Sequence, residues 1–370
     1  MLDDFFFLLQ GIRLEYLKYV YLHSCEYISE LPELCTPSLE TLGLFDCENL
    51  VKVHEQPRFL NKLQIWNLSG CRKLQILPSL KLKSLKRLYL GWCYSLIELP
   101  ELYAPSLEEL DLLHCENLVK VHESVGNLDK LKIWDLEFCR KLETLPDILR
   151  LKSLEKFNLF CCFKLEKFPD IHPEMKCLKS LNLRWSGIRE LPSSIEYLTG
   201  LELLNLSCCE NLGYLPDDLY KLQLIDKQSI PTAKLIAYDY LDGFSGGAFL
   251  KLKSLSFSCN KNIIELDFLM KPEYFPELNS LNLSETNIVS IPESLSRFAN
   301  LEVLDIRDCK QLREISRLPQ SILDVNLSNC CSLNAQSSSR LLNQVSLSSS
   351  FFILSYKETI FVTFFPNSIC

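Results

Sequence analysis

A frame of sixteen residues recurs along most of this chain, and it constrains the fold more than any other feature of the sequence. The copy at residues 131–146 has apolar residues at positions 1, 4, 6, 12 and 15 of the frame, Cys at position 9 and Pro at position 16. Positions 4 and 6 alternate with polar residues, so we expect their side chains to share one face of a short strand. Thirteen copies begin at Leu17, Leu39, Leu63, Leu85, Leu107, Leu131, Leu154, Leu178, Leu201, Leu252, Leu278, Leu301 and Ile322.

A single copy of the frame is too small to fold alone. It buries about six apolar side chains at roughly 1.5–3 kcal/mol each, whereas fixing the backbone of about 23 residues costs roughly 1–2 kcal/mol per residue. Stacked copies bury a continuous core, and L-x-x-L-x-L-x-x-C is the signature of leucine-rich repeats. The sequence therefore predicts an α/β solenoid, a leucine-rich-repeat horseshoe with a curved parallel β-sheet on its concave face and irregular or short helical segments on its convex side.

The spacing of the copies predicts how the chain is divided. Most copies start 21 to 26 residues after the previous one, but one interval is 51 residues long. We expect a lead-in or crude cap at 1–16, repeats at 17–334 with an irregular island near 217–250, and an off-pattern tail at 335–370. Within that tail, the segment 337–344 is expected to form a short helix.

The cysteines follow the repeat rather than a disulfide pattern. Of the seventeen, ten occupy position 9: Cys25, Cys47, Cys71, Cys93, Cys115, Cys139, Cys162, Cys209, Cys309 and Cys330. A buried thiol at this turn acts as a small apolar group with a weak S–H donor for the backbone. Unpaired buried thiols are typical of a reducing compartment, so we expect a cytoplasmic or nucleocytoplasmic protein. The cysteine doublets lack C-x-x-C spacing, and no metal site is expected.

Charge and composition exclude several functional classes. The net charge of −8 argues against a nucleic-acid-binding surface. No stretch of 18 or more apolar residues is present, so no membrane-spanning helix is expected. We find no catalytic constellation in the sequence and expect neither an enzyme nor a bound cofactor.

The sequence also repeats over a longer interval that contains several copies of the frame. The segment CENLVKVHE occurs at 47–55 and again at 115–123, which is 68 residues later, and two shorter segments recur at the same offset. We infer that a block of three repeats was duplicated as a unit.

Large aromatic and charged residues gather at the outward-facing positions of consecutive repeats. Positions 3, 5 and 7 should point away from the core, and position 8 should lie at the rim. The predicted partner-binding residues of the concave face are Tyr89, Trp92, Asp111, His114, Asp135, Glu137, Phe138, Phe160, Arg184 and Trp185. Exposed aromatic residues flanked by charges are typical of protein-binding surfaces. The alternative is that these side chains only pack against their neighbours along the face.

The segment LKSLNLRWSGIRELPSSIEYLTGLELLNLSCCENLGYLP at 178–216 resembles the leucine-rich-repeat region of plant intracellular immune receptors. These receptors carry an N-terminal Toll/interleukin-receptor-like domain and a central nucleotide-binding switch. Alternation of C-x-x-L-x-x-LP and T-x-I-x-x-LP repeats is typical of them, and the resemblance covers roughly residues 17–344. It implies a module that senses pathogen effectors directly or through a host protein, and that contacts its own nucleotide-binding domain to hold an intact receptor inactive. The alternative is an intracellular scaffold for protein–protein interaction in signalling.

Two parts of such receptors are missing from this sequence. No G-x-x-x-x-G-K-[ST] phosphate loop occurs, and no Toll/interleukin-receptor-like domain precedes the repeats. The nucleotide switch and the NAD-cleaving activity are therefore not implied for this chain. We expect a receptor fragment, a truncated gene product or a gene-model artefact.

Overall fold

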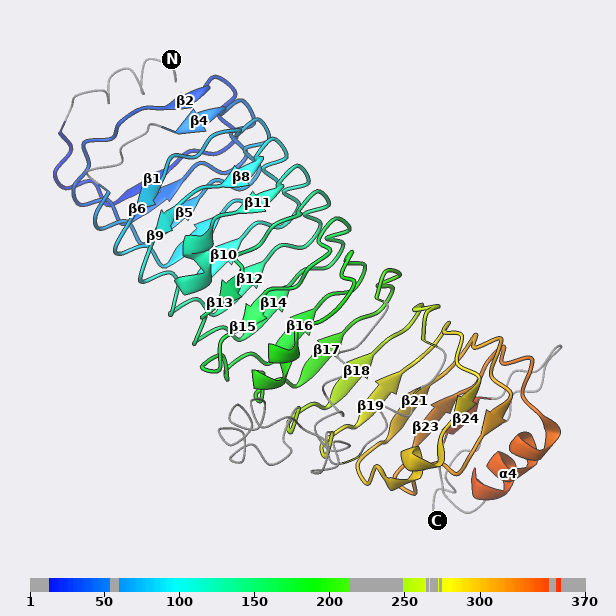
Figure 1. Ribbon diagram of the computed structural model, residues 1–370. Coiled ribbons are helices and arrows are strands. Elements are labelled where there is room, and N and C mark those ends of the chain that lie inside the picture. The colour runs from blue at the N-terminus through cyan, green and yellow to red at the C-terminus, as the bar shows by residue number, and fades with distance from the viewer. Residues whose placement is uncertain are drawn as a thin grey trace, which may run out of the picture. The chain divides into compact units, whose positions relative to one another are not determined.

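The computed structural model describes residues 13–53, 60–212, 249–263, 266, 272, 275–345 and 351–353. Two compact units divide the chain, Met1–Ile188 and Arg189–Cys370, and each is a stack of repeats (Figure 1). The island predicted near 217–250 lies almost entirely outside the described residues, as do the first twelve residues of the predicted lead-in.

A parallel sheet runs through each unit, with one strand from every repeat. In the first unit its strands are β1 (Tyr19–Tyr21), β3 (Thr41–Gly43), β5 (Ile65–Asn67), β7 (Arg87–Tyr89), β10 (Glu109–Asp111), β12 (Ile133–Asp135), β14 (Lys156–Asn158) and β16 (Ser180–Asn182). In the second unit they are β17 (Leu203–Asn205), β18 (Ser254–Ser256), β19 (Ser280–Asn282), β21 (Val303–Asp305), β23 (Asp324–Asn326) and β24 (Phe351–Ile353). Neighbours pair in register, for example Leu110 with Trp134.

The parallel-sheet solenoid predicted from the sequence is confirmed. Each of the thirteen predicted copies supplies one strand, and that strand always consists of positions 3 to 5 of the frame. The exception to the expected plan is β24, which pairs with β23 although its residues belong to the stretch expected to be off pattern.

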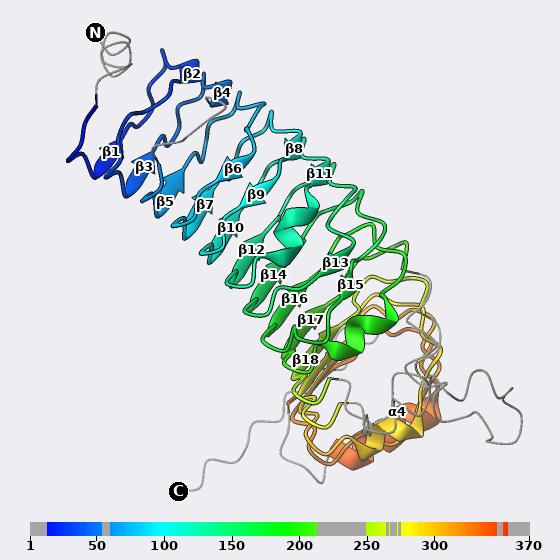
Figure 2. The same cartoon turned by 60° about the vertical axis from the view of Figure 1, so that its left-hand side comes forward.

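The outer side of the repeats is more regular than predicted. Among the described residues, five pairs of very short parallel strands lie there: β2 (Glu30–Leu31) with β4 (Lys52–Val53), β6 (Leu80–Lys81) with β9 (Leu102–Tyr103), β8 (Glu98–Leu99) with β11 (Lys120–Val121), β13 (Ile148–Leu149) with β15 (Asp170–Ile171), and β20 (Ser290–Ile291) with β22 (Glu314–Ile315). Figure 2 shows β8, β11, β13 and β15 following one another opposite the main strands of the first unit.

The described helices are short. Three 3₁₀ helices occupy outer segments: η1 (Glu123–Asn127), η2 (Ser193–Tyr197) and η4 (Glu293–Arg297). The α-helix α4 (Ala335–Val345) contains the segment 337–344, for which the sequence predicts a helix, and that prediction is confirmed.

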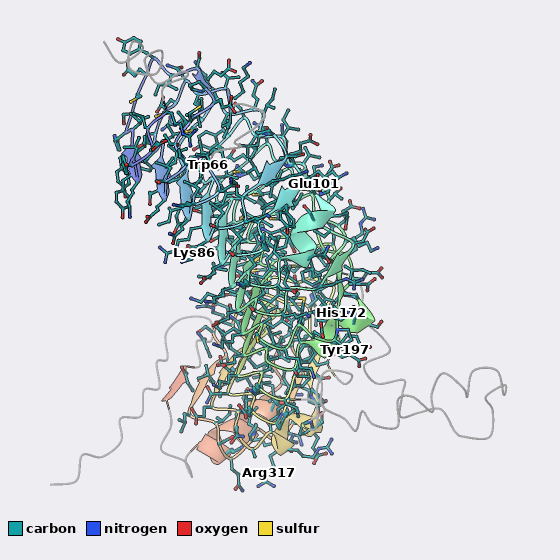
Figure 3. All side chains as sticks on the ribbon, turned by 90° about the vertical axis from the view of Figure 1, so that its left-hand side faces the viewer. Trp66, Lys86, Glu101, His172, Tyr197 and Arg317 are labelled. Atoms are coloured by element: carbon teal, nitrogen blue, oxygen red, sulfur yellow. The ribbon has the colours of Figure 1, made fainter. Side chains whose placement is uncertain are left out.

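The core consists of the frame's apolar side chains. Trp66 and Trp134, both at position 4, are fully buried, and the Trp134 ring stacks on Phe157 of the next repeat with centroids 4.7 Å apart. In Figure 3 Trp66 lies within the first unit, whereas Lys86 and Glu101 lie on opposite sides of it.

In most repeats a thiol at position 9 links the repeat to the one before it. Its Sγ donates to the carbonyl oxygen at position 6 of the preceding repeat, for example Cys115 to Leu90 at 3.1 Å. The same bond is made by Cys71 at 3.1 Å, Cys93 at 3.3 Å, Cys139 at 3.2 Å, Cys162 at 3.2 Å, Cys309 at 3.2 Å and Cys330 at 3.0 Å. Burial raises the pKa of the Cys71 thiol to about 12, so the thiol keeps the proton that it donates. Three repeats have another residue at position 9, namely Ser186, Asn260 and Thr286. Asn260 Nδ2 makes the corresponding bond to Leu206 at 2.8 Å, whereas Thr286 Oγ1 donates to Leu283 within its own repeat at 2.7 Å.

In nine repeats, Asn or Asp at position 5 caps the turn that ends the main strand. Its Oδ1 accepts a hydrogen bond from the backbone N–H at position 7, at 2.8 Å from Leu113 to Asp111 and at 2.9 Å from Glu137 to Asp135. The same cap is formed by Asn67, Asn158, Asn182, Asn205, Asn282, Asp305 and Asn326. A short side chain that bonds its own backbone two residues on stabilises a turn.

Replacement of Cys115 by Ala should lower the free energy of unfolding by about 1–2 kcal/mol, because a buried donor and its packing volume are lost. Urea unfolding followed by far-UV circular dichroism measures this. Cys177 is exposed in the same unit, and its replacement by Ala should leave the midpoint unchanged. Equal midpoints for the two variants would contradict a structural role for the ladder thiol.

Replacement of Asp111 by Asn should stabilise the chain at pH 7. Burial raises the pKa of Asp111 above its ordinary value of 3.8, so the folded state binds its proton more tightly than the unfolded state does. Stability from this group is therefore present at low pH and is lost as the pH rises through the native pKa. Asn keeps the capping oxygen and carries no charge, so its advantage should shrink as the pH falls through that pKa.

The control for this prediction is Asp111→Ala, which removes the cap and should destabilise the chain by about 1 kcal/mol at every pH. Urea midpoints of the three proteins across the acidic range provide the comparison. An Asn variant that is less stable than the wild type at pH 7 would contradict the assignment.

Candidate functional site

The residues predicted to bind a partner all lie on the first unit, on one surface. We call it the sheet face; it is formed by positions 3, 5, 7 and 8 of the repeats that contain β7, β10, β12, β14 and β16. Apart from Cys161, its side chains are exposed or half-buried, with Trp92 exposed by 42% and Trp185 by 37%. The face is therefore open to a partner along several consecutive strands.

Four of the predicted residues form a continuous stack of rings, the aromatic row of Trp92, His114, Phe138 and Phe160. The Trp92 and His114 centroids are 3.9 Å apart, with 18° between the ring planes. His114 and Phe138 stack at 4.3 Å and 14°, and Phe160 meets Phe138 edge-on at 5.1 Å and 80°. The row spans four consecutive repeats.

The rings of the aromatic row pack against their neighbours along the face, as the alternative interpretation expects, and partner binding by their exposed parts stays a prediction. The inner rings cover one another's faces, and each such contact contributes about 0.5–1.5 kcal/mol. The guanidinium groups of Arg140 and Arg184 lie 5.7 Å and 5.8 Å from the centroids of Phe138 and Phe160. Trp92 ends the row and stays largely exposed. The aromatic row is thus a pre-ordered surface, whose side chains would lose little conformational freedom on binding.

Trp185 belongs to a separate group. Position 8 of the repeat between it and Phe138 is Cys161, whose side chain is buried and which continues no stack. Trp185 instead meets Phe163 edge-on, with centroids 6.4 Å apart and ring planes at 81°. The sheet face therefore has a long aromatic row and a smaller aromatic pair.

Three members of the aromatic row, Trp92, His114 and Phe138, occupy a backbone position that does not suit large side chains, whereas Phe160 lies at position 7. Position 8 is left-handed, with φ of 64° at Trp92, 58° at His114 and 59° at Phe138. This lets the N–H of Trp92 donate to the carbonyl of Leu113 at 2.7 Å, which extends the sheet ladder past the strand. A residue other than Gly pays about 1–2 kcal/mol for that conformation. Gly70 occupies the same position at φ 76° without this cost.

The duplicated block shows what the same backbone holds elsewhere. At the positions 68 residues before Trp92, His114 and Phe138, the first copy has Ser24, Asp46 and Gly70. Those three residues are also left-handed. The aromatic row is therefore a feature of the second copy, and the turn forms without it in the first.

The remaining predicted residues are held by polar contacts. One carboxylate oxygen of Asp111 and one of Asp135 accept the turn-cap hydrogen bonds described above. The sequence analysis did not predict this role, although Asn or Asp recurs at position 5 of the frame. Glu137 Oε2 accepts a bond from Asn158 Nδ2 at 2.8 Å. Tyr89 donates its hydroxyl to Glu109 Oε2 at 3.0 Å. Burial, followed by this bond, raises the pKa of Tyr89 to about 12.

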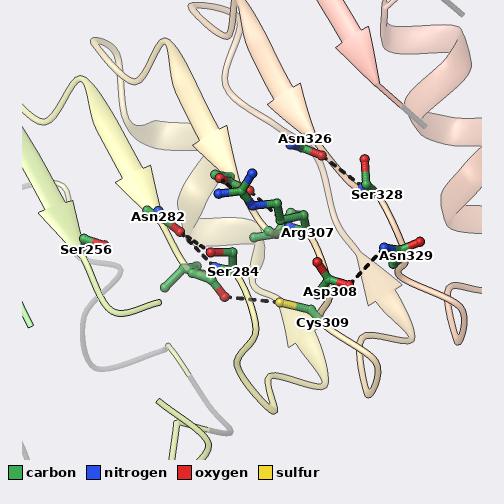
Figure 4. A network of polar contacts seen from close by, with 12 residues as sticks. Ser256, Asn282, Ser284, Arg307, Asp308, Cys309, Asn326, Ser328 and Asn329 are labelled. Atoms are coloured by element: carbon green, nitrogen blue, oxygen red, sulfur yellow. Dashed lines mark hydrogen bonds and ion pairs between the residues drawn. The ribbon is translucent and has the colours of Figure 1, made fainter. Parts of the chain in front are cut away.

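The second unit presents a different surface. Its positions 5, 7 and 8 over β18 to β23 carry Ser, Asn, Asp, Arg, Glu and Cys and no aromatic residue. Figure 4 shows this network, in which Asn282 and Asn326 cap their turns. Asp305 accepts the corresponding cap and also pairs with Arg307 Nε at 3.4 Å. A row of aromatic residues at these positions is thus found in the first unit and not over β18 to β23.

Two further observations concern the described residues alone. No cluster of three or more His, Cys, Asp or Glu residues among them has the arrangement of a metal site. None of the helices they form is both long and apolar enough to cross a bilayer.

Comparison with known proteins gives the family. Residues 150–355 match the family model described as "Disease resistance protein RPS4B-like, leucine-rich repeats". The chain is also 40% identical over 76 residues to disease resistance protein RPP4 of Arabidopsis thaliana, a match that covers 20% of this chain and only 7% of RPP4.

Two solved structures are similar at low identity. A leucine-rich-repeat protein of Leptospira interrogans is 18% identical with a TM-score of 0.38, over 93% of this chain and 97% of that one. The plant peptide hormone receptor RGFR1, in complex with RGF2, is 17% identical with a TM-score of 0.33, over 80% of this chain and 62% of that one. Neither likeness carries information on what this chain binds. The family model spans more than half of the chain, and this protein therefore belongs to the RPS4B-like leucine-rich-repeat family of disease resistance proteins.

Proposed function

We propose that this chain is a non-catalytic recognition module that binds a protein partner through the sheet face of its first unit. In the setting of plant disease resistance, the partner is a pathogen effector or a host protein that the effector alters. Within an intact receptor, the chain's own nucleotide-binding domain is a further partner, and contact with it contributes to autoinhibition.

The observation that carries this proposal is the aromatic row at the left-handed turn positions. Three large side chains occupy a conformation that costs about 1–2 kcal/mol each, and the first copy of the same block does without them. Ring stacking offsets part of that cost. What stacking does not explain is the exposure that remains at Trp92. Exposed, pre-ordered aromatic rings beside charges are the usual anchors of protein interfaces.

The state of the cysteines supports a cytoplasmic or nucleocytoplasmic location. All sixteen cysteines in the described part of the chain are free thiols, and most are buried. Free thiols in such number suit a reducing compartment, which is where effectors delivered into plant cells would be met. No observation favours the alternative of a general signalling scaffold.

Exchange of the aromatic row for its first-copy counterparts should abolish partner binding without unfolding the chain. The variant is Trp92→Ser, His114→Asp and Phe138→Gly combined, and each new residue already occupies this turn at Ser24, Asp46 or Gly70. We expect binding to weaken by about 30-fold or more, as for loss of hot-spot residues. A panel of purified effectors and host proteins, screened by surface plasmon resonance, measures it.

The matched control is Tyr103→Ala, which removes an aromatic residue that is 50% exposed on β9, on the outer side of the same unit. It should leave binding unchanged. Far-UV circular dichroism and the urea midpoint report whether each variant is folded. A folded triple variant that keeps wild-type affinity would refute the proposed function.

A further inference from the structure

The part of the sheet face next to the aromatic row is acidic. Asp111 and Asp135 are directly paired residues of the neighbouring strands β10 and β12. Glu137 follows two residues after Asp135, on the same face. Three carboxylates therefore lie close together on two adjacent repeats, and each is half-buried.

These three carboxylates lack the cationic neighbours that other acids on the main sheets have. Within the part of the chain that the structure describes, none of the three forms an ion pair. By contrast, Glu109 pairs with Arg87 at 3.7 Å in the same unit. In the second unit, Asp305 at position 5 pairs with Arg307 at 3.4 Å. The negative charge on this part of the sheet face is left without compensation.

The hydrogen bonds already made leave acceptor capacity toward solvent. Asp111 and Asp135 each use Oδ1 for a turn cap, and Glu137 uses Oε2 for Asn158. A carboxylate has two oxygens and about four acceptor sites. Burial and, for Asp135, repulsion from Asp111 raise the pKa of both aspartates. A cation docked here would relieve that repulsion.

The exposed end of the aromatic row offers a second place for a cation. His114 covers one face of the Trp92 indole. On the other side the preceding repeat has Gly70, so no ring stacks there, and the Asp46 carboxylate occupies the space that a Gly70 side chain would need. An indole face with a carboxylate nearby is the environment that a Lys or Arg side chain prefers.

We propose that the sheet face of the first unit binds a Lys- or Arg-bearing segment of the partner protein. One cationic side chain rests on the Trp92 indole beside Asp46, and another lies over Asp111, Asp135 and Glu137. This rests on the proposed function and names the chemistry that the partner presents.

Apolar and basic side chains around the three carboxylates determine where a Lys- or Arg-bearing segment can bind. Ile133, which is 37% exposed and lies two residues before Asp135 on β12, can contact the apolar side chains of the segment. Arg140 and Arg184 lie over the rings of Phe138 and Phe160. Their charge repels a basic segment from that end, which confines it to the repeats from β3 to β12. The uncompensated carboxylates repel nucleic-acid phosphates and acidic peptides.

The test uses two fluorescently labelled peptides of equal length, one alternating Arg with Leu and one alternating Glu with Leu. Fluorescence anisotropy with the full 370-residue chain should show binding of the Arg peptide only, and the affinity should fall as ionic strength rises. The double variant Asp111→Asn with Asp135→Asn keeps both turn caps. It should weaken binding of the Arg peptide roughly tenfold, and Trp92→Ser should weaken it further.

The matched control neutralises two carboxylates that lie off the sheet face, by Glu101→Gln with Glu143→Gln. These residues are exposed, and Glu101 lies on the outer side in Figure 3. The control has the same change in net charge and should bind the Arg peptide like the wild type. If both double variants lost affinity for the Arg peptide equally, net charge alone would explain the loss, and the proposal would be overturned.

Two other outcomes also overturn it: no binding of the Arg peptide, or equal binding of both peptides. If either occurs while the triple exchange in the aromatic row still abolishes capture of a protein partner, the proposed function stands and the basic-segment inference alone fails. If the triple exchange has no effect either, both fail.

Discussion

In most repeats a thiol at position 9 reaches back to the carbonyl oxygen at position 6 of the repeat before it. Cys115 and Leu90 show this contact at 3.1 Å, and Asn260 makes an amide version of it to Leu206. The bond satisfies a buried carbonyl at the turn, while the Leu side chains on either side close the core. Because it joins neighbours rather than ends of the chain, stability accumulates one repeat at a time. The strands, turn caps and outer pairs are held in place by this stacking.

Much of the fold was readable from the sequence, since the period-two alternation at positions 4 and 6 and the spacing of the Leu residues fix where each strand lies. The outer strands were not, because a pair such as Glu98 and Leu99 is too short to show a period. The turn caps could have been predicted, because Asn or Asp recurs at position 5 of the frame. Asp111 and Asp135 were instead interpreted only as partner-binding residues. The stacking of Trp92 on His114 could not be predicted from the sequence. It depends on a left-handed backbone at position 8, and no local sequence pattern indicates that conformation.

Several residues of the sheet face are unfavourable for stability, and the same residues suit the proposed recognition of a partner. Burial raises the pKa of Asp111 and so makes its charged form costly, whereas an uncharged Asn forms the same cap in six other repeats. Trp92, His114 and Phe138 occupy turns where Gly70 is free of strain. Each choice is unfavourable for folding and supplies something that a partner could use, a negative charge or an exposed ring. The second unit, with Asn282 and a paired Asp305, lacks both features.

The most direct measurement of the central claim is the rate at which each thiol of the native chain reacts with a maleimide, read by peptide mass spectrometry. The exposed thiols of Cys177 and Cys331 should react as fast in the native chain as in the denatured one. The ladder thiols Cys71, Cys93, Cys115, Cys139 and Cys162 are fully buried and should stay unmodified until the chain is unfolded. Ladder thiols that react in the native chain at the rate of Cys177 would show that they face water, and the account of a repeat spine closed by buried thiols would be wrong.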